Sequence, residues 1–237
     1  MLKTGLSVLI MAASASGLAA SSPAEDGARL MAQMKVAMGG PALDAPAGFH
    51  ETGTGTRDGA AMSYETWGDL KSLRSASTHS LGGHSMSGGF DGKVAWSTDP
   101  QGVTRIDNSA DGLASARLGT YLTIGAYFYP DRFPARFEYR GKKQADGKPF
   151  DVVSVTPEGS VPLDLWLDPA THRLQRISGT DGKVTFDGVV QRYQVVDGAW
   201  IGFSLVETEG PHRTVLNLAS YVFGDIPQER FSPPQQH

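Results

Sequence analysis

The clearest catalytic candidate in the sequence is a short glycine- and serine-rich stretch, Gly83-His84-Ser85-Met86-Ser87. Serine esterases hold their nucleophile in a strained turn between a strand and a helix, and that turn requires glycine two residues on either side of the serine. Gly83 satisfies this requirement before Ser85, but Ser87 stands where the second glycine is needed. The surrounding pattern favours a Gly-rich hairpin or bulge, and an esterase centred on Ser85 remains an alternative.

A second candidate is a pair of carboxylates around a tryptophan, formed by Asp164, Trp166 and Asp168. On an extended strand these three side chains share one face. Two carboxylates placed together can hydrolyse a glycosidic bond, and a tryptophan between them is a common platform for a sugar. The alternate positions, such as Leu163 and Leu165, are apolar. They favour a strand that buries its leucines and exposes the carboxylates to solvent, with a glycan hydrolase as the alternative.

Composition weighs against several other classes of function. The six histidines include no His-x-x-x-His pair, and the chain has no cysteine that could complete a zinc site. No glycine-rich phosphate loop is present. The net charge is −4, without a cluster of Lys and Arg, which argues against nucleic acid as a partner. We therefore predict no metal, no cofactor and no catalytic residue.

The N-terminus has the residue order of a secretory signal peptide: Lys3 is followed by an apolar stretch and then by small residues up to Ala20. The apolar stretch is shorter than the roughly 18 residues of a membrane span. Because the chain lacks cysteine, it has no residue that could be lipidated at the cleavage site. We predict an exported, soluble periplasmic protein with a signal peptide over 1–20 and a single domain over 21–237.

The first element of the mature chain is predicted to be a helix over 23–38. Ser22 and Glu25 have the spacing of a capping box, and Pro23 suits the first helical position. Methionines and other apolar residues then recur at helical spacing. Gly39 and the glycine after it provide the backbone freedom that ends a helix.

A second helical segment is predicted over 111–129. Apolar residues recur there at intervals typical of a helix, and the segment carries no charge after Arg117. Pro130 is expected to end it. A helix that is apolar on nearly all sides is buried or covers an apolar surface.

The remaining segments, from Phe49 onward, alternate with period two between turns such as Asp91-Gly92. Short turns make consecutive strands antiparallel neighbours. We expect roughly ten or eleven strands in up-and-down order, and so large a twisted sheet tends to curl. The predicted fold class is mainly β: a large curled antiparallel sheet, an incomplete β-barrel, with the N-terminal helix and the central helical insert packed on its concave face.

Several short stretches resemble the family of the periplasmic lipoprotein carrier LolA. They are the segment 69–74, the hairpin 91–100 with its Asp-Gly, Trp and Asp-Pro, the segment 163–171, and the terminal Phe-Ser-Pro-Pro over 231–234. The resemblance implies an incomplete barrel closed by helices, with an apolar cavity that receives acyl chains. In that family an arginine on an early strand holds the helical lid shut, and Arg74 is the best match to it.

We therefore predict a periplasmic carrier that binds the acyl chains of lipoproteins or lipids. Each buried methylene contributes roughly 0.8 kcal/mol, and methionine side chains repack readily when a ligand leaves. The expected partners are a lipid or a lipidated protein, together with an inner- or outer-membrane protein. The alternatives are an envelope sensor or accessory domain that detects a lipid and binds a partner protein, and the two hydrolases above. The predicted cavity and gate residues are Met31, Met34, Met38, Trp96, Tyr121, Leu122 and Phe128, with Arg74 as the gate.

Overall fold

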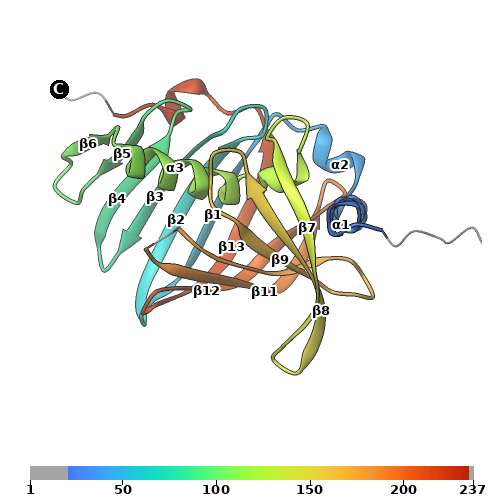
Figure 1. The fold of residues 1–237 in the computed structure, drawn as a ribbon. Helices are drawn as coiled ribbons and strands as arrows, with labels where there is room; N and C mark the ends of the chain where they lie inside the picture. Colours follow the sequence, from blue (N-terminus) through green and yellow to red (C-terminus); the bar gives the residue numbers. More distant parts are fainter. Residues whose placement is uncertain (1–20, 182, 235–237) are drawn as a thin grey trace, which may run out of the picture.

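The computed structural model describes residues 21–181 and 183–234, and the predicted signal peptide over 1–20 lies outside them (Figure 1). In this described part, no helix is long and apolar enough to cross a membrane. The helical elements are α1 Pro23–Met38, α2 Pro41–Asp44 and α3 Ala110–Thr123, with the 3-10 turns η1 Ala126–Phe128 and η2 Gln228–Phe231.

The strands of the described residues form one antiparallel sheet of thirteen members. The first six strands are β1 Gly48–Arg57, β2 Ala60–Asp69, β3 Arg74–Leu81, β4 His84–Phe90, β5 Ala95–Thr98 and β6 Thr104–Asp107. The other seven are β7 Ala135–Ala145, β8 Lys148–Pro157, β9 Leu163–Leu167, β10 Leu174–Thr180, β11 Thr185–Val196, β12 Ala199–Glu209 and β13 His212–Gly224.

The sheet consists of two meanders joined side by side. Its strand order is β6-β5-β4-β3-β2-β1-β13-β12-β11-β10-β9-β8-β7, so β1 pairs with β13 and the edges are β6 and β7. The predicted curled, mainly antiparallel fold is confirmed, whereas the predicted count of strands was too low. Residues 84–90 pair with β3 as a full strand, after a turn at Gly82 and Gly83. The sheet curls, and α3, which connects the two meanders, runs across its concave side (Figure 1).

One hydrogen bond identifies which side of each strand faces α3. The hydroxyls of Ser75 on β3 and Thr120 on α3 lie 3.0 Å apart. Phe90 is in register with Ser75, so it points to the same side of the sheet. We call this side the inner face. Side chains alternate along a strand, and therefore Ala76 and its cross-strand neighbours point to the opposite, outer face.

The predicted helix over 23–38 is confirmed as α1, and it begins with the predicted capping box between Ser22 and Glu25. Its buried side faces β7. A Cβ atom on Gly27 would lie 2.9 Å from the backbone of Phe137 and Glu138. The absence of a side chain at Gly27 thus allows α1 to pack directly against the strand.

The second predicted helix, over 111–129, ends earlier than expected. Helix α3 stops at Thr123, and Gly125 then adopts a left-handed conformation with φ of 58° before the short turn η1. Glycine adopts this conformation without steric cost and interrupts the helix before Pro130 does. The helix is also not apolar on all sides, because it buries Leu118 and Tyr121 and leaves its other face in solvent.

Candidate ligand-binding site on the inner face

Six of the seven predicted cavity residues lie in or against one apolar cluster on the inner face of the sheet. Met31, Met34, Met38, Tyr121 and Phe128 are buried members of it, and Leu122 packs against it. Leucines and valines of β8 and β9 complete the cluster from the sheet side. The structure therefore brings the methionine side of α1 together with α3 and η1 inside the curl of the sheet. In this structure their side chains pack on one another.

Polar side chains continue the inner face beyond this cluster. They include Glu51 on β1, Tyr64 on β2 and Glu207 on β12. Glu51 is in register with Tyr221, whose ring stacks on Phe49 and packs against the apolar cluster. The sequence patterns did not single out Glu51, although the alternation that points Phe49 inward also points Glu51 inward.

Electrostatics on this part of the inner face disfavour the negative charge of Glu51. Burial and then the charge of Glu207 raise the pKa of Glu51 to about 7, although a hydrogen bond from the Thr66 hydroxyl works in the other direction. The pKa of Glu207 is also raised, by desolvation and by the charge of Glu209. The Glu207 side chain is exposed, and solvent therefore weakens this effect.

Two tyrosine hydroxyls on this side of the sheet, those of Tyr64 and Tyr121, are buried without a hydrogen-bond partner among residues 21–181 and 183–234. Tyr64 is 7% exposed and Tyr121 is 3% exposed. The Tyr64 ring lies over Gly53, where a Cβ atom would overlap its hydroxyl group. Burial raises the pKa of Tyr64, and the charges of Glu51 and Glu207 add to this effect.

Solved structures with a similar fold are known. A DUF1329 family protein from Desulfovibrio piger aligns with a TM-score of 0.61 and 14% sequence identity, over 90% of this chain and 98% of that one. A putative outer membrane lipoprotein-sorting protein domain from Vibrio parahaemolyticus aligns with a TM-score of 0.54 and 15% identity, over 84% of this chain and 93% of that one. The chain has a LolA-like fold. No protein-family model matches the sequence, and a search of curated proteins finds no match.

Within the LolA-like fold, Trp96 lies apart from the other predicted cavity residues. It belongs to a separate cluster with Trp67, Ala76 and Phe231. Its indole nitrogen donates a hydrogen bond of 2.8 Å to the carbonyl oxygen of Phe231. The reason is strand alternation, because Trp96 is in register with Gly89, which in turn pairs with Ala76 of the outer face.

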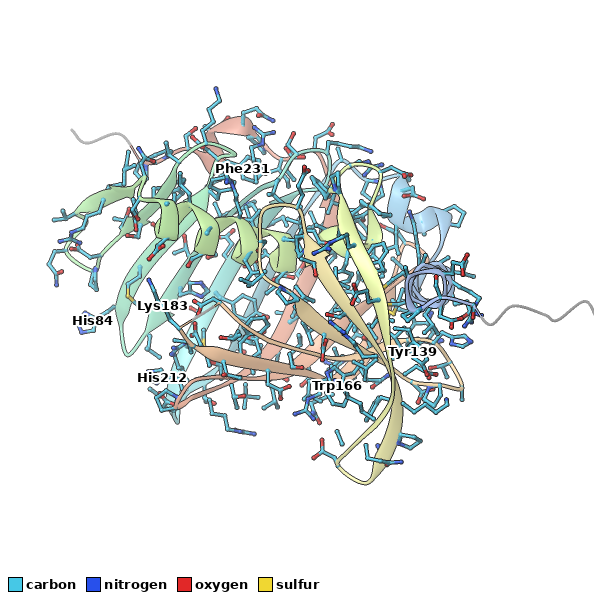
Figure 2. All side chains as sticks on the ribbon, viewed as in Figure 1. His84, Tyr139, Trp166, Lys183, His212 and Phe231 are labelled. Carbon is cyan, nitrogen blue, oxygen red and sulfur yellow. The ribbon has the colours of Figure 1, made fainter. Side chains whose placement is uncertain are left out.

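Arg74, the residue expected to hold a helical lid, fastens the C-terminal turn η2 in this structure. Its guanidinium pairs with Asp69 and donates a hydrogen bond to Gln228. It also lies over the ring of Phe231, 4.9 Å from the ring centroid. We call the segment Gln228–Phe231 the C-terminal latch. Figure 2 labels Phe231 on this latch, well away from α1.

The residues of the two hydrolase alternatives lie in a strand, form an ion pair or accept hydrogen bonds from a turn. Ser85 is an exposed residue within strand β4, where an esterase elbow would need a turn. Asp164 forms an ion pair of 3.0 Å with Lys143. Burial opposes the ionisation of Asp168, but hydrogen bonds from Thr171 outweigh it and hold the pKa of Asp168 below its usual value. Among the described residues, no group of three or more His, Asp or Glu side chains is arranged to hold a metal ion.

Proposed function

We propose that this protein is a periplasmic carrier that binds the hydrocarbon chain of a lipid or of a lipidated protein. In this proposal residues 1–20 direct export, and residues 21–237 act as one domain. One observation carries the proposal: the apolar side of α1 and the segment α3–η1 meet inside the curl of a sheet whose fold is shared with a lipoprotein-sorting domain.

The segment α3–η1 is the part that a ligand chain would displace. Among the described residues, two side-chain polar contacts link α3 to the rest of the molecule: the hydrogen bond between Thr120 and Ser75, and an exposed ion pair of 3.1 Å between Asp111 and Lys183. An exposed ion pair contributes at most about 1 kcal/mol. Gly125 provides a flexible position between α3 and η1. Outward movement of α3 would therefore break few polar contacts.

The apolar surface beneath α3 suits a flexible chain. A chain of about 16 carbons offers on the order of 10 kcal/mol of hydrophobic stabilisation before ordering costs. Met31, Met34 and Met38 can adjust to either occupant because their side chains are unbranched and polarisable.

The experiment that tests this function is native mass spectrometry of the protein purified from the periplasm. We expect a population heavier than the mature chain by the mass of a lipid. Leu122→Ser, on the inner side of α3, should reduce that population. Leu113→Ser on the same helix is the matched control, since Leu113 is not part of the inner cluster. Protein that remains lipid-free, both as purified and after incubation with periplasmic lipid extract, contradicts the proposal.

A further inference from the structure

The outer face of the sheet carries a polar groove, on the side opposite the main apolar cluster. The groove has a volume of about 400 Å³, and its lining residues come from β7 to β11, from Arg140 to Thr185. Neighbouring strands lie about 4.8 Å apart, so these five strands span on the order of 19 Å. A volume of this size is typical of sites that bind small molecules.

Three polar side chains form one row in this groove: Ser154 on β8, Asp164 on β9 and Ser178 on β10. Asp164 is in register with both serines. Leu163 and Leu165 flank Asp164 in sequence and belong to the inner apolar cluster, so strand alternation directs Asp164 outward. The row therefore places one hydroxyl on each side of a carboxyl.

Two neighbouring side chains hold this row in place. The Nζ atom of Lys143 on β7 lies 3.0 Å from a carboxylate oxygen of Asp164 and 5.4 Å from the ring centroid of Trp166. The indole nitrogen of Trp166, which Figure 2 labels, donates a hydrogen bond of 2.9 Å to the Ser178 hydroxyl oxygen. Because that oxygen accepts from the indole, the Ser178 hydroxyl keeps its own hydrogen as a donor.

Ser154 provides an independent indication that a polar ligand belongs in the groove. It is 4% exposed and nevertheless lines the groove. None of the side-chain hydrogen bonds within residues 21–181 and 183–234 involves its hydroxyl. Buried polar groups are nearly always hydrogen-bonded, to protein or to a bound molecule. The Ser154 hydroxyl thus marks a position where a polar ligand atom would be held.

The cations of the groove are already paired. Lys143 pairs with Asp164, and Arg140 lies 3.3 Å from Glu138. A charged ligand would have to separate one of these ion pairs, whereas an uncharged polar ligand can bond to both members of a pair. Of the described residues that line the groove, Asp164 is the only one with a carboxyl group. Hydrolysis of a glycosidic bond needs two carboxyls, so the groove is suited to binding rather than to cleavage.

We propose that this groove binds an uncharged saccharide chain through a pair of adjacent hydroxyls. A sugar hydroxyl both donates and accepts hydrogen bonds. One of two adjacent hydroxyls can donate to the carboxylate of Asp164 while the next accepts from the ammonium of Lys143. Hydrogen bonds to charged groups of this kind are the stronger ones. Ser154 and Ser178 bond to the neighbouring hydroxyls.

The saccharide site lies on the face of the sheet opposite the proposed acyl-chain site. It therefore holds or fails independently of the carrier function.

The test is isothermal titration calorimetry of the protein with four tetrasaccharides: cellotetraose, maltotetraose, chitotetraose and tetragalacturonate. The first two carry adjacent hydroxyls on every ring. In chitotetraose an acetamido group replaces one hydroxyl of that pair, and tetragalacturonate keeps the pair but adds carboxylates. We expect cellotetraose or maltotetraose to bind with a Kd below about 1 mM. Chitotetraose should bind about tenfold more weakly, as the loss of a hydrogen bond to a charged group predicts, and tetragalacturonate should also bind more weakly.

The variant that isolates the groove is Asp164→Asn, which keeps the shape of the side chain and removes its charge. It should weaken the binding of the neutral tetrasaccharide at least about tenfold. Ser178→Ala should weaken it by about fivefold, since one neutral hydrogen bond is lost. The matched control is Asp146→Asn, which removes the same charge outside the groove, where Asp146 lies 3.5 Å from Arg176. This control should bind as the wild type does, and circular dichroism verifies that each variant is folded.

Every outcome supports or overturns the proposal. Absence of binding by all four tetrasaccharides overturns it, and so does tightest binding by tetragalacturonate, which would assign the groove to an anion. Equal binding of the three neutral chains overturns recognition through adjacent hydroxyls. Binding that survives unchanged in Asp164→Asn overturns the assignment to this groove. An equal loss in Asp146→Asn overturns it too, because only overall charge would then have been measured.

Discussion

Helices α1 and α3 both place apolar side chains inside the curl of the sheet, but they are held there in different ways. The N-terminus of α1 is closed by a capping box, and the helix packs so closely that Gly27 meets the backbone of β7. Helix α3 is capped by Ser109, buries fewer residues and exposes Gly119 to open space. Within the described part of the chain, its side-chain polar links are one hydroxyl pair with β3 and one exposed ion pair with Lys183, in the turn before β11.

The difference indicates that α1 and α3 have different roles in one apolar cluster. Helix α1 forms a fixed wall, because moving it would expose side chains as deeply buried as Met34, which has 0% exposure. Helix α3 is a cover that lies over the same cluster and buries fewer residues. In a carrier, a fixed wall and a separable cover allow a chain to enter without unfolding the sheet.

The largest expected difference between the helices concerns stability. Met34→Ala should lower the free energy of unfolding by about 2–5 kcal/mol, because it leaves a cavity in a fully buried site. Leu122→Ala on the partly buried side of α3 should lower it by only about 1 kcal/mol. Urea denaturation followed by circular dichroism measures both values. Equal losses would mean that α3 is as much a part of the core as α1.

Two matched glycine substitutions, one in each helix, should change the stability of the protein in opposite directions. Gly27→Ala places a methyl group 2.9 Å from β7 backbone, which cannot move aside. We expect a loss of about 1–3 kcal/mol from this overpacking. Gly119→Ala in α3 meets no atom within 4 Å. It should gain about 0.5–1 kcal/mol from helix propensity. Thermal unfolding of the two variants tests the difference, and a stabilised Gly27→Ala would refute the tight packing of α1.

The two helices also differ in how far the sequence predicts them. Capping, spacing and the glycine pair that define α1 are all local, so the sequence gives its limits correctly. The end of α3 was misjudged because Pro130 is a more conspicuous stop than Gly125, which acts through backbone conformation alone. The period-two alternation and the short turns are also local patterns, and they predicted a curled antiparallel sheet.

The sequence patterns could not predict contacts between distant parts of the chain. The C-terminal latch lies against Trp96 and Arg74, which are separated from it by more than a hundred residues in sequence order. No periodicity links these segments, so Trp96 was grouped with the inner residues and Arg74 with a helical lid. The shared inner face of Glu51 and Glu207 was missed for the same reason, because β1 and β12 meet only through β13.

A disulfide between α3 and the sheet would test whether the cover must move. The Ser75 and Thr120 hydroxyls are 3.0 Å apart, and the native chain has no cysteine that could interfere. The double variant Ser75→Cys/Thr120→Cys, once oxidised, should bind a hydrocarbon ligand at least about tenfold more weakly than its reduced form, because a bond replaces a separable contact. Fluorescence titration with a lipid probe measures both forms. Ser75→Cys alone, under the same oxidant, is the control, and unchanged binding in the oxidised double variant would show that chains enter without movement of α3.

The smallest expected effect is a pH dependence that arises in the sheet rather than in either helix. The pKa of Glu51 is raised from 4.5 to about 7 in the folded protein, so the folded state binds more protons than the unfolded state between these values. Stability should therefore fall as the pH rises from 4.5 to about 7, and it should stay lower above that range. Glu51→Gln should remove this component and stabilise the protein by about 1 kcal/mol at about pH 8, with little effect at about pH 4. Met34→Ala, in contrast, should lower stability by the same amount at both pH values. If Glu51→Gln also shifts stability equally at both pH values, the Glu51 carboxyl is not held in a charge-disfavouring site.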